Sequence, residues 1–382
     1  MSDLFFKISP NIILGSYTAS RIGQFAKDWG TRYIVILDPV LKESGATDSI
    51  LKSLSARKVE YFVFDEIKSA VDSETVKRVL SLAREAHIHG VIGVGGSSVM
   101  NLARAVSAIY NEVHDLYDFL DGSTPTSGAL PLISVPTTIR NMFIFTESVP
   151  VVDARNRQLK LIKVQNGLCK LVLFDSNLNV SLTENQVGAI SIDSLCLATE
   201  AYLSQKASFF SDMLAEKAVE SLGYAMDGSN SLNISATPTT LLIQGGCVAS
   251  LASATSSIGP ASLLGLAISA RYNVSHALVA TILLPYVIED VAKYKADRIA
   301  KIARIMNLVD EDTSPEEVPS IFAENIRHRL AHANLPARLK DLSLTMEQLS
   351  LAAEDAGQMD LINGMPRSMT ADDLFELIKL AY

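Results

Sequence analysis

The chain has 382 residues, of which 48% are hydrophobic and 20% are charged, and it carries a formal net charge of −9. A chain of this length exceeds what one hydrophobic core usually supports, so we expect two domains. The acidic balance argues against nucleic acid as a partner. The 3 cysteines lack CxxC spacing and the start lacks a signal-peptide pattern, which together predict a cytoplasmic protein with reduced thiols.

Short apolar runs alternate with helical patterns in the first half of the chain. Runs rich in Val and Ile, each ended by turn residues, predict buried strands over residues 32–38, 59–65, 90–95, 130–136 and 171–175. Helical patterns lie between them, such as 72–86, where Asp72 stands at the cap position. This alternation predicts a mostly parallel sheet with right-handed crossovers.

The pattern changes after residue 175, because recognisable strands give way to long helical periods. Helices are expected over residues 183–205, 212–226, 238–252, 292–306 and 315–334. The sequence therefore predicts an α/β domain over 1–180 and an all-helical domain over 181–382. The uncharged stretch 228–270 is broken by Ser, Thr, Gly and Pro, so it predicts buried helices and no membrane partner.

A glycine-rich turn, Gly95-Gly96-Ser97-Ser98, follows the predicted strand 90–95 and opens a helical run over 99–110. Glycines permit a tight turn and the close approach of a ligand, and the amides at the start of a helix attract an anion. The turn therefore predicts a pyrophosphate site. An ordinary strand-to-helix turn is the alternative, because a glycine-rich turn alone is a weak signal.

Polar side chains follow two further predicted strands. Asp38 comes at the end of one strand, where its carboxylate could accept hydrogen bonds from an adenosine ribose and would repel a 2′-phosphate, which favours NAD over NADP. Thr137 and Thr138 follow Pro136, and their hydroxyls could bind phosphate or ribose oxygens. The alternative makes Asp38 a helix cap before Pro39 and the threonines part of a turn.

Several motifs, taken in order and at their separations, make the chain resemble the iron-containing alcohol dehydrogenase family of the dehydroquinate synthase-like superfamily. They are the glycine-rich turn with Asn101-Leu-Ala-Arg-Ala, Pro136-Thr137-Thr138, Ser191-Ile-Asp193 with Glu200-Ala-Tyr202, and Tyr272-Asn-Val-Ser-His276. The resemblance implies a dinucleotide-binding α/β domain followed by a helical domain. It also implies NAD(P)-dependent oxidation of a small alcohol or reduction of a carbonyl, and a homodimer with an N-terminal strand at the interface.

The resemblance also implies which residues would bind the cofactor. They are Asp38, Gly95, Gly96, Ser97, Ser98, Asn101, Thr137, Thr138 and Lys160, of which Lys160 would lie near the cofactor ribose.

The metal-binding pattern of the family is incomplete in this chain. Members of the family use an aspartate, a histidine four residues later, and two histidines fourteen residues apart; Asp193 matches the first ligand and His276 the last, but Leu197 and Ser262 replace the other two. A carboxylate and one imidazole would leave most of the coordination shell to water, so the sequence predicts a degenerate site that argues against a bound divalent metal. A different set from Asp193, His276 and Cys196, with Glu200 nearby, is an alternative; a buried structural Cys196 is the other.

The loop after the twin threonines also departs from the family. Its small Gly-Thr-Gly-Ser-Glu is replaced by the bulky segment 140–144. One interpretation is a metal-independent oxidoreductase in which His276 donates a proton and Arg140 or Lys160 attracts an anionic substrate. A backbone-bonded His276 at a helix start and a solvated Arg140 are the structural alternatives. The other interpretation is an inactive member that keeps a cofactor-binding or assembly scaffold, because Leu197 would fill a polar cavity with apolar volume.

Overall fold

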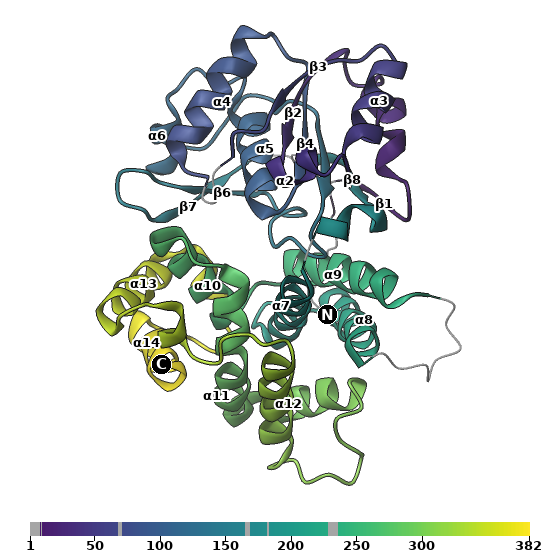
Figure 1. Ribbon diagram of the computed structural model, residues 1–382. Helices are drawn as coiled ribbons and strands as arrows, with labels where there is room; N and C mark the ends of the chain where they lie inside the picture. Colours follow the sequence, from purple (N-terminus) through teal and green to yellow (C-terminus); the bar gives the residue numbers. More distant parts are fainter. Residues whose placement is uncertain (1–7, 9, 68–70, 165–168, 182, 228–235) are drawn as a thin grey trace. The chain divides into compact units, whose positions relative to one another are not determined.

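The computed structural model describes residues 8, 10–67, 71–164, 169–181, 183–227 and 236–382. The chain divides into two compact units, Ile8–Ser181 and Leu182–Tyr382. The first is built on a parallel sheet and the second on helices (Figure 1). The predicted fold class is therefore confirmed.

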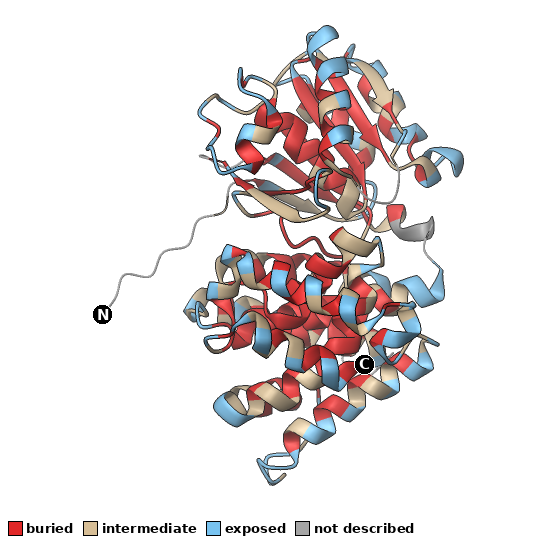
Figure 2. Cartoon of the chain, turned by 90° about the vertical axis from the view of Figure 1, so that its left-hand side faces the viewer, coloured by how far each residue is buried: buried red, intermediate tan, exposed pale blue. Residues whose placement is uncertain are grey.

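A six-stranded sheet of order β1-β8-β5-β4-β2-β3 forms the centre of the α/β unit, and every neighbouring pair in it is parallel. Its strands are β1 (Asn11–Leu14), β2 (Arg32–Leu37), β3 (Glu60–Phe64), β4 (Gly90–Gly95), β5 (Leu132–Pro136) and β8 (Cys169–Phe174). The strands expected from the apolar runs are confirmed, with ends displaced by two residues or fewer. The central strands are buried on both faces (Figure 2), which is why they read as continuous apolar runs.

Helices cover both faces of this sheet. They are η1 (Ala19–Arg21), α1 (Ile22–Ala26), α2 (Pro39–Glu43), α3 (Asp48–Ala56), α4 (Ser73–Glu85), α5 (Ser97–Ile109) and α6 (Leu116–Leu120). Alternate side chains of β2, such as Tyr33 and Val35, join one core with Ile22 and Leu54 from α1 and α3. On the other face α5 packs closely on β4, because a Cβ at Gly93 would lie 2.9 Å from the Cβ of Ala103.

An antiparallel hairpin was missed by the sequence prediction. It consists of β6 (Ser148–Val152) and β7 (Leu159–Lys163) and forms a separate two-stranded sheet. Each strand has five residues and β6 contains Pro150, so neither run shows the long β-branched pattern on which the prediction relied. The hairpin turn is held at the start of α4, where the amide of Ala154 donates to Ser73 Oγ at 3.0 Å.

The second unit consists of helices packed around α7. Its elements are α7 (Glu184–Leu203), α8 (Phe209–Asp227), α9 (Pro238–Thr255), α10 (Pro260–Tyr272), α11 (His276–Ile305), α12 (Val318–His332), η3 (Leu339–Leu342), α13 (Met346–Gln358), η4 (Asp360–Gly364) and α14 (Ala371–Ala381). Every residue of α7 from Ser191 to Leu203 is buried, as expected for a central helix. Within the described residues no single helix is long and apolar enough to cross a membrane; α9 and α10 meet that criterion only as a pair bent by 96°.

The helical prediction was incomplete in two places. Helices α10, α13 and α14 were not predicted, and α11 begins at His276, sixteen residues before the predicted start of 292. Helix α10 is buried on most sides, so its sequence lacks the polar face that reveals a surface helix. The predicted start near 292 lies close to Lys295, where α11 has a non-helical residue (φ −137°, ψ 40°).

Candidate functional site

The glycine-rich turn has the geometry of an anion site. Strand β4 ends at Gly95, Gly96 is the N-cap of α5 and the helix begins at Ser97. A Cβ at Gly95 would lie 2.5 Å from Val99 Cγ2 and 3.1 Å from Asp38 Cβ, so only glycine fits there. Because Gly96 has no side chain with which to cap α5, the positive end of the helix dipole is open to a ligand.

Three adjacent strand ends meet at this turn, because β2, β4 and β5 are neighbours in one parallel sheet. The amide of Asp38 donates to the Val94 carbonyl at 3.0 Å, and the amide of Thr137 donates to the Gly95 carbonyl at 3.0 Å. A Cβ at Gly96 would lie 3.7 Å from Thr138 Cγ2. The structure thus brings the predicted cofactor residues of three strands together, while their role in binding stays a prediction.

The side chains of Asp38 and Thr138 also form hydrogen bonds with the local backbone. Asp38 Oδ1 accepts a hydrogen bond from the Val40 amide at 3.1 Å and caps α2, with Pro39 in the first helical position. Thr138 Oγ1 donates to the Arg140 carbonyl at 3.1 Å. The cap and turn alternatives are therefore present. They leave acceptor capacity on the Asp38 carboxylate, which has two oxygens with about four lone-pair sites.

Asn101 adds an independent sign of a ligand in the first turns of α5. Its Oδ1 atom is buried and has no hydrogen-bond partner among the residues that the structure describes. Buried polar atoms are almost always hydrogen-bonded, so an orphaned acceptor beside an open helix start points to a missing donor. A cofactor hydroxyl or an ordered water would supply that donor.

Arg140 and Lys160 lie on the two segments that follow β5. Arg140 is 3% exposed, so the alternative that it is solvated is wrong: the segment 139–145 is buried as a whole. Lys160 lies on β7 and is half-buried. The pKa of Asp153 is held below its usual range mainly by a hydrogen bond from Arg155, and the charge of Lys160 contributes in the same direction. Lys160 is therefore placed beside acidic groups of the hairpin.

The residual metal positions lie in the helical unit. Asp193 is on α7, and His276 is the first residue of α11, with His276 Nε2 lying 3.8 Å from Asp193 Oδ2. The His276 side chain is 26% exposed and the Asp193 side chain only 1%. Leu197 and Ser262 are fully buried. The structure thus pairs one carboxylate with one partly accessible imidazole.

Glu200, on the same helix, is used as a cap for α10. Its Oε1 accepts a hydrogen bond from the Ala261 amide at 2.7 Å, and its Oε2 accepts from the amides of Gly259 at 3.1 Å and Ser262 at 3.2 Å. Burial raises the pKa of Glu200 to about 7, against the opposing effect of the hydrogen bonds from Ser262, Ala261 and Gly259. Both oxygens of the carboxyl group therefore bind backbone amides at the start of α10 and join α7 to that helix.

The alternative metal set is not formed. Cys196 Sγ lies 4.0 Å from the Ala280 carbonyl and donates to it. Across the described ranges, no group of three or more His, Cys, Asp or Glu side chains could hold a metal ion. The residues present do not fit the metal that the family resemblance implies.

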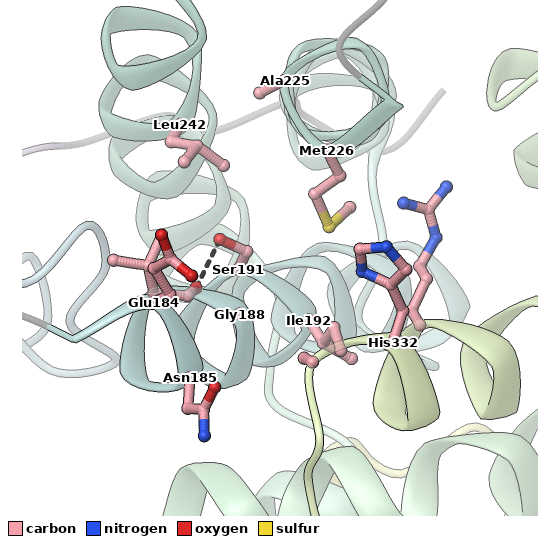
Figure 3. Close-up of a pocket in the computed structure, with 12 residues that line it drawn as sticks. Glu184, Asn185, Gly188, Ser191, Ile192, Ala225, Met226, Leu242 and His332 are labelled. Atoms are coloured by element: carbon pink, nitrogen blue, oxygen red, sulfur yellow. Dashed lines mark hydrogen bonds between the residues drawn. The ribbon is translucent and has the colours of Figure 1, made fainter.

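A pocket of about 460 Å³, open to solvent, lies in the helical unit between α7, α8, α9 and α12. Figure 3 shows Met226 and His332 on one side of it and Gly188 and Ser191 on α7. Arg329, which also lines it, pairs with Asp227 at 2.6 Å, and Ser191 Oγ donates to the Val187 carbonyl at 2.6 Å. Glu184 and Arg329, two charged side chains that line this pocket, have opposite signs, so the lining selects no single ligand charge.

Two residues with clear roles were given none by sequence reasoning: Arg104 and, as a helix cap, Glu200. Arg104 is the only charged residue between Ser97 and Ile109, and a lone charge in an otherwise uncharged helix is a usable signal. Glu200 precedes Gly259 by 59 positions, and no local pattern reveals so distant a cap.

Comparison with known proteins gives consistent matches over nearly the whole chain. The model described as "Iron-containing alcohol dehydrogenase" matches residues 9–176, and the model of the C-terminal part of the same family matches residues 189–382. Lactaldehyde reductase of Escherichia coli is 24% identical over 352 residues, 91% of each chain. The 1,3-propanediol dehydrogenase of Citrobacter freundii is 21% identical over 99% of each chain.

Solved structures show the same fold. A 1,3-propanediol oxidoreductase superposes with a TM-score of 0.90 at 20% identity over 100% of both chains. An alcohol dehydrogenase from Oenococcus oeni gives a TM-score of 0.90 at 20% identity over 99% of this chain and 100% of that one.

Proposed function

Because the chain belongs to the iron-containing alcohol dehydrogenase family, we propose that it is an NAD(P)-dependent oxidoreductase that interconverts a small alcohol and its carbonyl compound without the usual bound metal. The observation that carries the proposal is the open glycine turn at the start of α5, where a Cβ at Gly95 would clash. The names of the relatives, which include lactaldehyde reductase and 1,3-propanediol dehydrogenase, support a small substrate of this class.

The residues at the three strand ends fit a dinucleotide. The open start of α5 would hold the pyrophosphate, Asn101 and the twin threonines Thr137 and Thr138 would bind polar groups of the cofactor, and Asp38 would accept from the adenosine ribose. When bound, a nicotinamide cofactor gives or takes the hydride. A carboxylate at Asp38 would repel a 2′-phosphate, so we infer a preference for NAD over NADP.

His276 and Asp193 supply the proton chemistry in this proposal. The His276 Nε2 lies 3.8 Å from the buried Asp193 carboxylate, which would attract the protonated imidazole, and the accessible side of the ring can give a proton to a carbonyl oxygen or take one from an alcohol. No step is assigned to a metal, because the described residues provide only two of the four ligands that the family pattern requires. The positive charge of the buried Arg140 or of the half-buried Lys160 would attract an anionic substrate.

The proposal is tested by following NADH oxidation with a panel of aldehydes and keto acids, in protein whose metal content has been measured after chelation. We expect turnover that chelation leaves intact and that His276→Ala reduces by about a hundredfold, the usual contribution of general acid–base catalysis. Turnover that vanishes with chelation and returns with a metal would overturn the metal-independent mechanism. An unchanged rate in His276→Ala would remove His276 from it.

A second candidate is an inactive family member that keeps the cofactor-binding scaffold. The fully buried Leu197 favours it, because an apolar side chain stands where the family places a ligand. A titration of NADH binding, run beside the turnover assay, distinguishes the two functions: cofactor binding without turnover of any substrate in the panel supports the scaffold and contradicts the enzyme.

A further inference from the structure

Arg104 is a fully buried cation on the helix that begins at the glycine turn. It lies seven residues after Ser97 on α5, which corresponds to two helical turns, or about 10 Å along the axis. Its exposed fraction is 0%, and it is the largest of the fully buried side chains. Burial lowers its pKa to about 10, so the guanidinium stays protonated at neutral pH.

Among the described residues, the hydrogen-bond acceptors of this guanidinium are three backbone carbonyls of one segment. Nη1 donates to the Ile144 carbonyl at 3.1 Å, and Nη2 donates to the carbonyls of Thr146 at 2.8 Å and Ser148 at 2.9 Å. No carboxylate pairs with it within the ranges that the structure describes, and its Nε is buried without a partner there. A buried charge held only by carbonyls is costly, so packing alone does not account for arginine at this position.

The segment 139–148, to which Arg104 donates its hydrogen bonds, follows directly after Thr137 and Thr138. Thr138 Oγ1 donates to the Arg140 carbonyl at 3.1 Å, and the amide of Phe143 donates to Asn141 Oδ1 at 3.1 Å. Thr146 then closes the turn, because its hydroxyl donates to the Phe143 carbonyl at 2.9 Å. Residues 137–148 are therefore held together by hydrogen bonds, and the Arg104 guanidinium binds the C-terminal end of this segment.

We propose that Arg104 is a positioning residue for the cofactor site: it ties the helix that presents the glycine turn to the loop that presents Thr137 and Thr138. The two sides of the site lie on different elements, and the guanidinium fork joins them through three backbone carbonyls. Its positive charge also adds to the field at the start of α5, where an anion would bind. This inference rests on the proposed function, because it presumes that the site takes a dinucleotide.

Arg84 provides a matched control. On α4, it also donates to three backbone carbonyls: Nε to Tyr110 at 3.0 Å, and Nη2 to Ile109 at 3.0 Å and Glu112 at 2.8 Å. These acceptors lie at and beyond the C-terminal end of α5, opposite to the glycine turn. Arg84→Met therefore removes the same kind of contact from the same helix without touching the proposed site.

The experiment measures NADH affinity by calorimetric titration of the full-length wild type and of Arg104→Met, Arg104→Lys and Arg84→Met, below the unfolding midpoint of each. We expect Arg104→Met to raise the NADH Kd by about tenfold and Arg84→Met by less than about twofold, since one lost anchor is worth roughly this factor. Arg104→Lys keeps the charge but not the fork, so its Kd should be intermediate. Hydrogen exchange of amides 138–146 should be faster in both Arg104 variants.

The outcomes separate the two claims. Failure of the wild type and of Arg84→Met to bind NADH, or NADPH in a parallel titration, overturns the proposed function, and the role of Arg104 with it. Binding by the wild type with an unchanged Kd in a folded Arg104→Met overturns the positioning role alone. Where Arg104→Met does not fold, Arg104→Lys decides: an increase in Kd of about threefold or more supports the role, and a smaller change overturns it.

Discussion

Gly95 is the residue on which the shape of the phosphate turn depends most directly. An added methyl group would lie 2.5 Å from Val99 Cγ2, so Gly95→Ala must push α5 away from β4 or distort the turn. We expect a loss of stability of about 1–3 kcal/mol from this overpacking and a loss of most NADH affinity. Gly128→Ala is the control, because its Cβ would meet no atom within 4 Å. Chemical denaturation and NADH titration measure both effects; equal affinity in the two variants would exclude the turn from the cofactor site.

Leu197 and Ser262 occupy the two positions at which the metal-ligand pattern of the family is broken, so replacing both tests whether they prevent metal binding. In Leu197→His/Ser262→His, two imidazoles would stand at the positions where the family has ligands, beside Asp193 and His276. Burying histidine at two fully buried positions should lower the melting temperature of the metal-free variant. We expect Zn²⁺ to restore it, since binding to the folded state alone is stabilising. The same shift in wild-type protein would show that its own residues suffice for a metal.

Site residues could be predicted from the sequence where they belong to short local motifs. Asp38, the glycine turn and Thr137 were placed at three strand ends from sequence, and the structure joins them because adjacent parallel strands end at the same edge. The hydrogen bonds of the Arg104 guanidinium could not be predicted in this way, because their acceptors lie 40 to 44 residues away, in the loop before β6 and at the first residue of that strand. Long-range hydrogen bonds to backbone carbonyls leave no trace in the acceptor's sequence.

At the scale of elements, the contact between α7 and α10 depends on the buried carboxyl group of Glu200. Its pKa is about 7 in the folded protein and lies near 4.5 when exposed, so the folded state binds more protons between these values. The corresponding stability is fully present below about pH 4.5 and is lost as the pH rises through 7. We expect the free energy of unfolding to fall by about 3 kcal/mol across this window from this group alone.

Glu200→Gln tests this dependence because the amide does not titrate. Its unfolding free energy should be nearly flat between pH 5 and 8 relative to wild type, and lower than wild type at pH 5, since the amide nitrogen would face a backbone donor. Glu311→Gln, at an exposed position, should keep the wild-type slope. Identical slopes in wild type and Glu200→Gln would mean that Glu200 does not titrate in this range.

Helices and strands with a clear pattern of apolar and polar residues could be predicted from the sequence, and those without such a pattern could not. The buried strands and α4, with its Asp72 cap, followed from apolar runs and capping chemistry. The β6–β7 hairpin and α10 were missed, since one has short strands with a proline and the other is apolar nearly all round. In α11 the helical pattern predicted from 292 onwards covers only the part of the helix near and after the non-helical Lys295. The first part of the helix lacks a polar face, so its sequence shows no amphipathic signal.

On the scale of the whole molecule, β1 lies at one edge of the six-stranded sheet and pairs with β8 on one side. The other edge of such a strand can pair with a second chain. We propose a homodimer, which light scattering would report as twice the chain mass of 41.3 kDa. Ile12→Pro and Ile13→Pro, which each remove an amide from one or the other side of β1, should differ in their effect on dimerisation. A monomer at all concentrations would contradict the proposal.

We propose that the glycine turn and its neighbouring strand ends hold a nicotinamide dinucleotide. Hydrogen exchange measured by mass spectrometry with and without NAD⁺ tests it on the intact protein. We predict slower exchange in the first turn of α5, Ser97 to Met100, and at Thr137 and Thr138, with little change in α13 and α14. Binding of NAD⁺ that leaves these amides unprotected, or no binding at millimolar NAD⁺ and NADP⁺, would contradict a dinucleotide site at this turn.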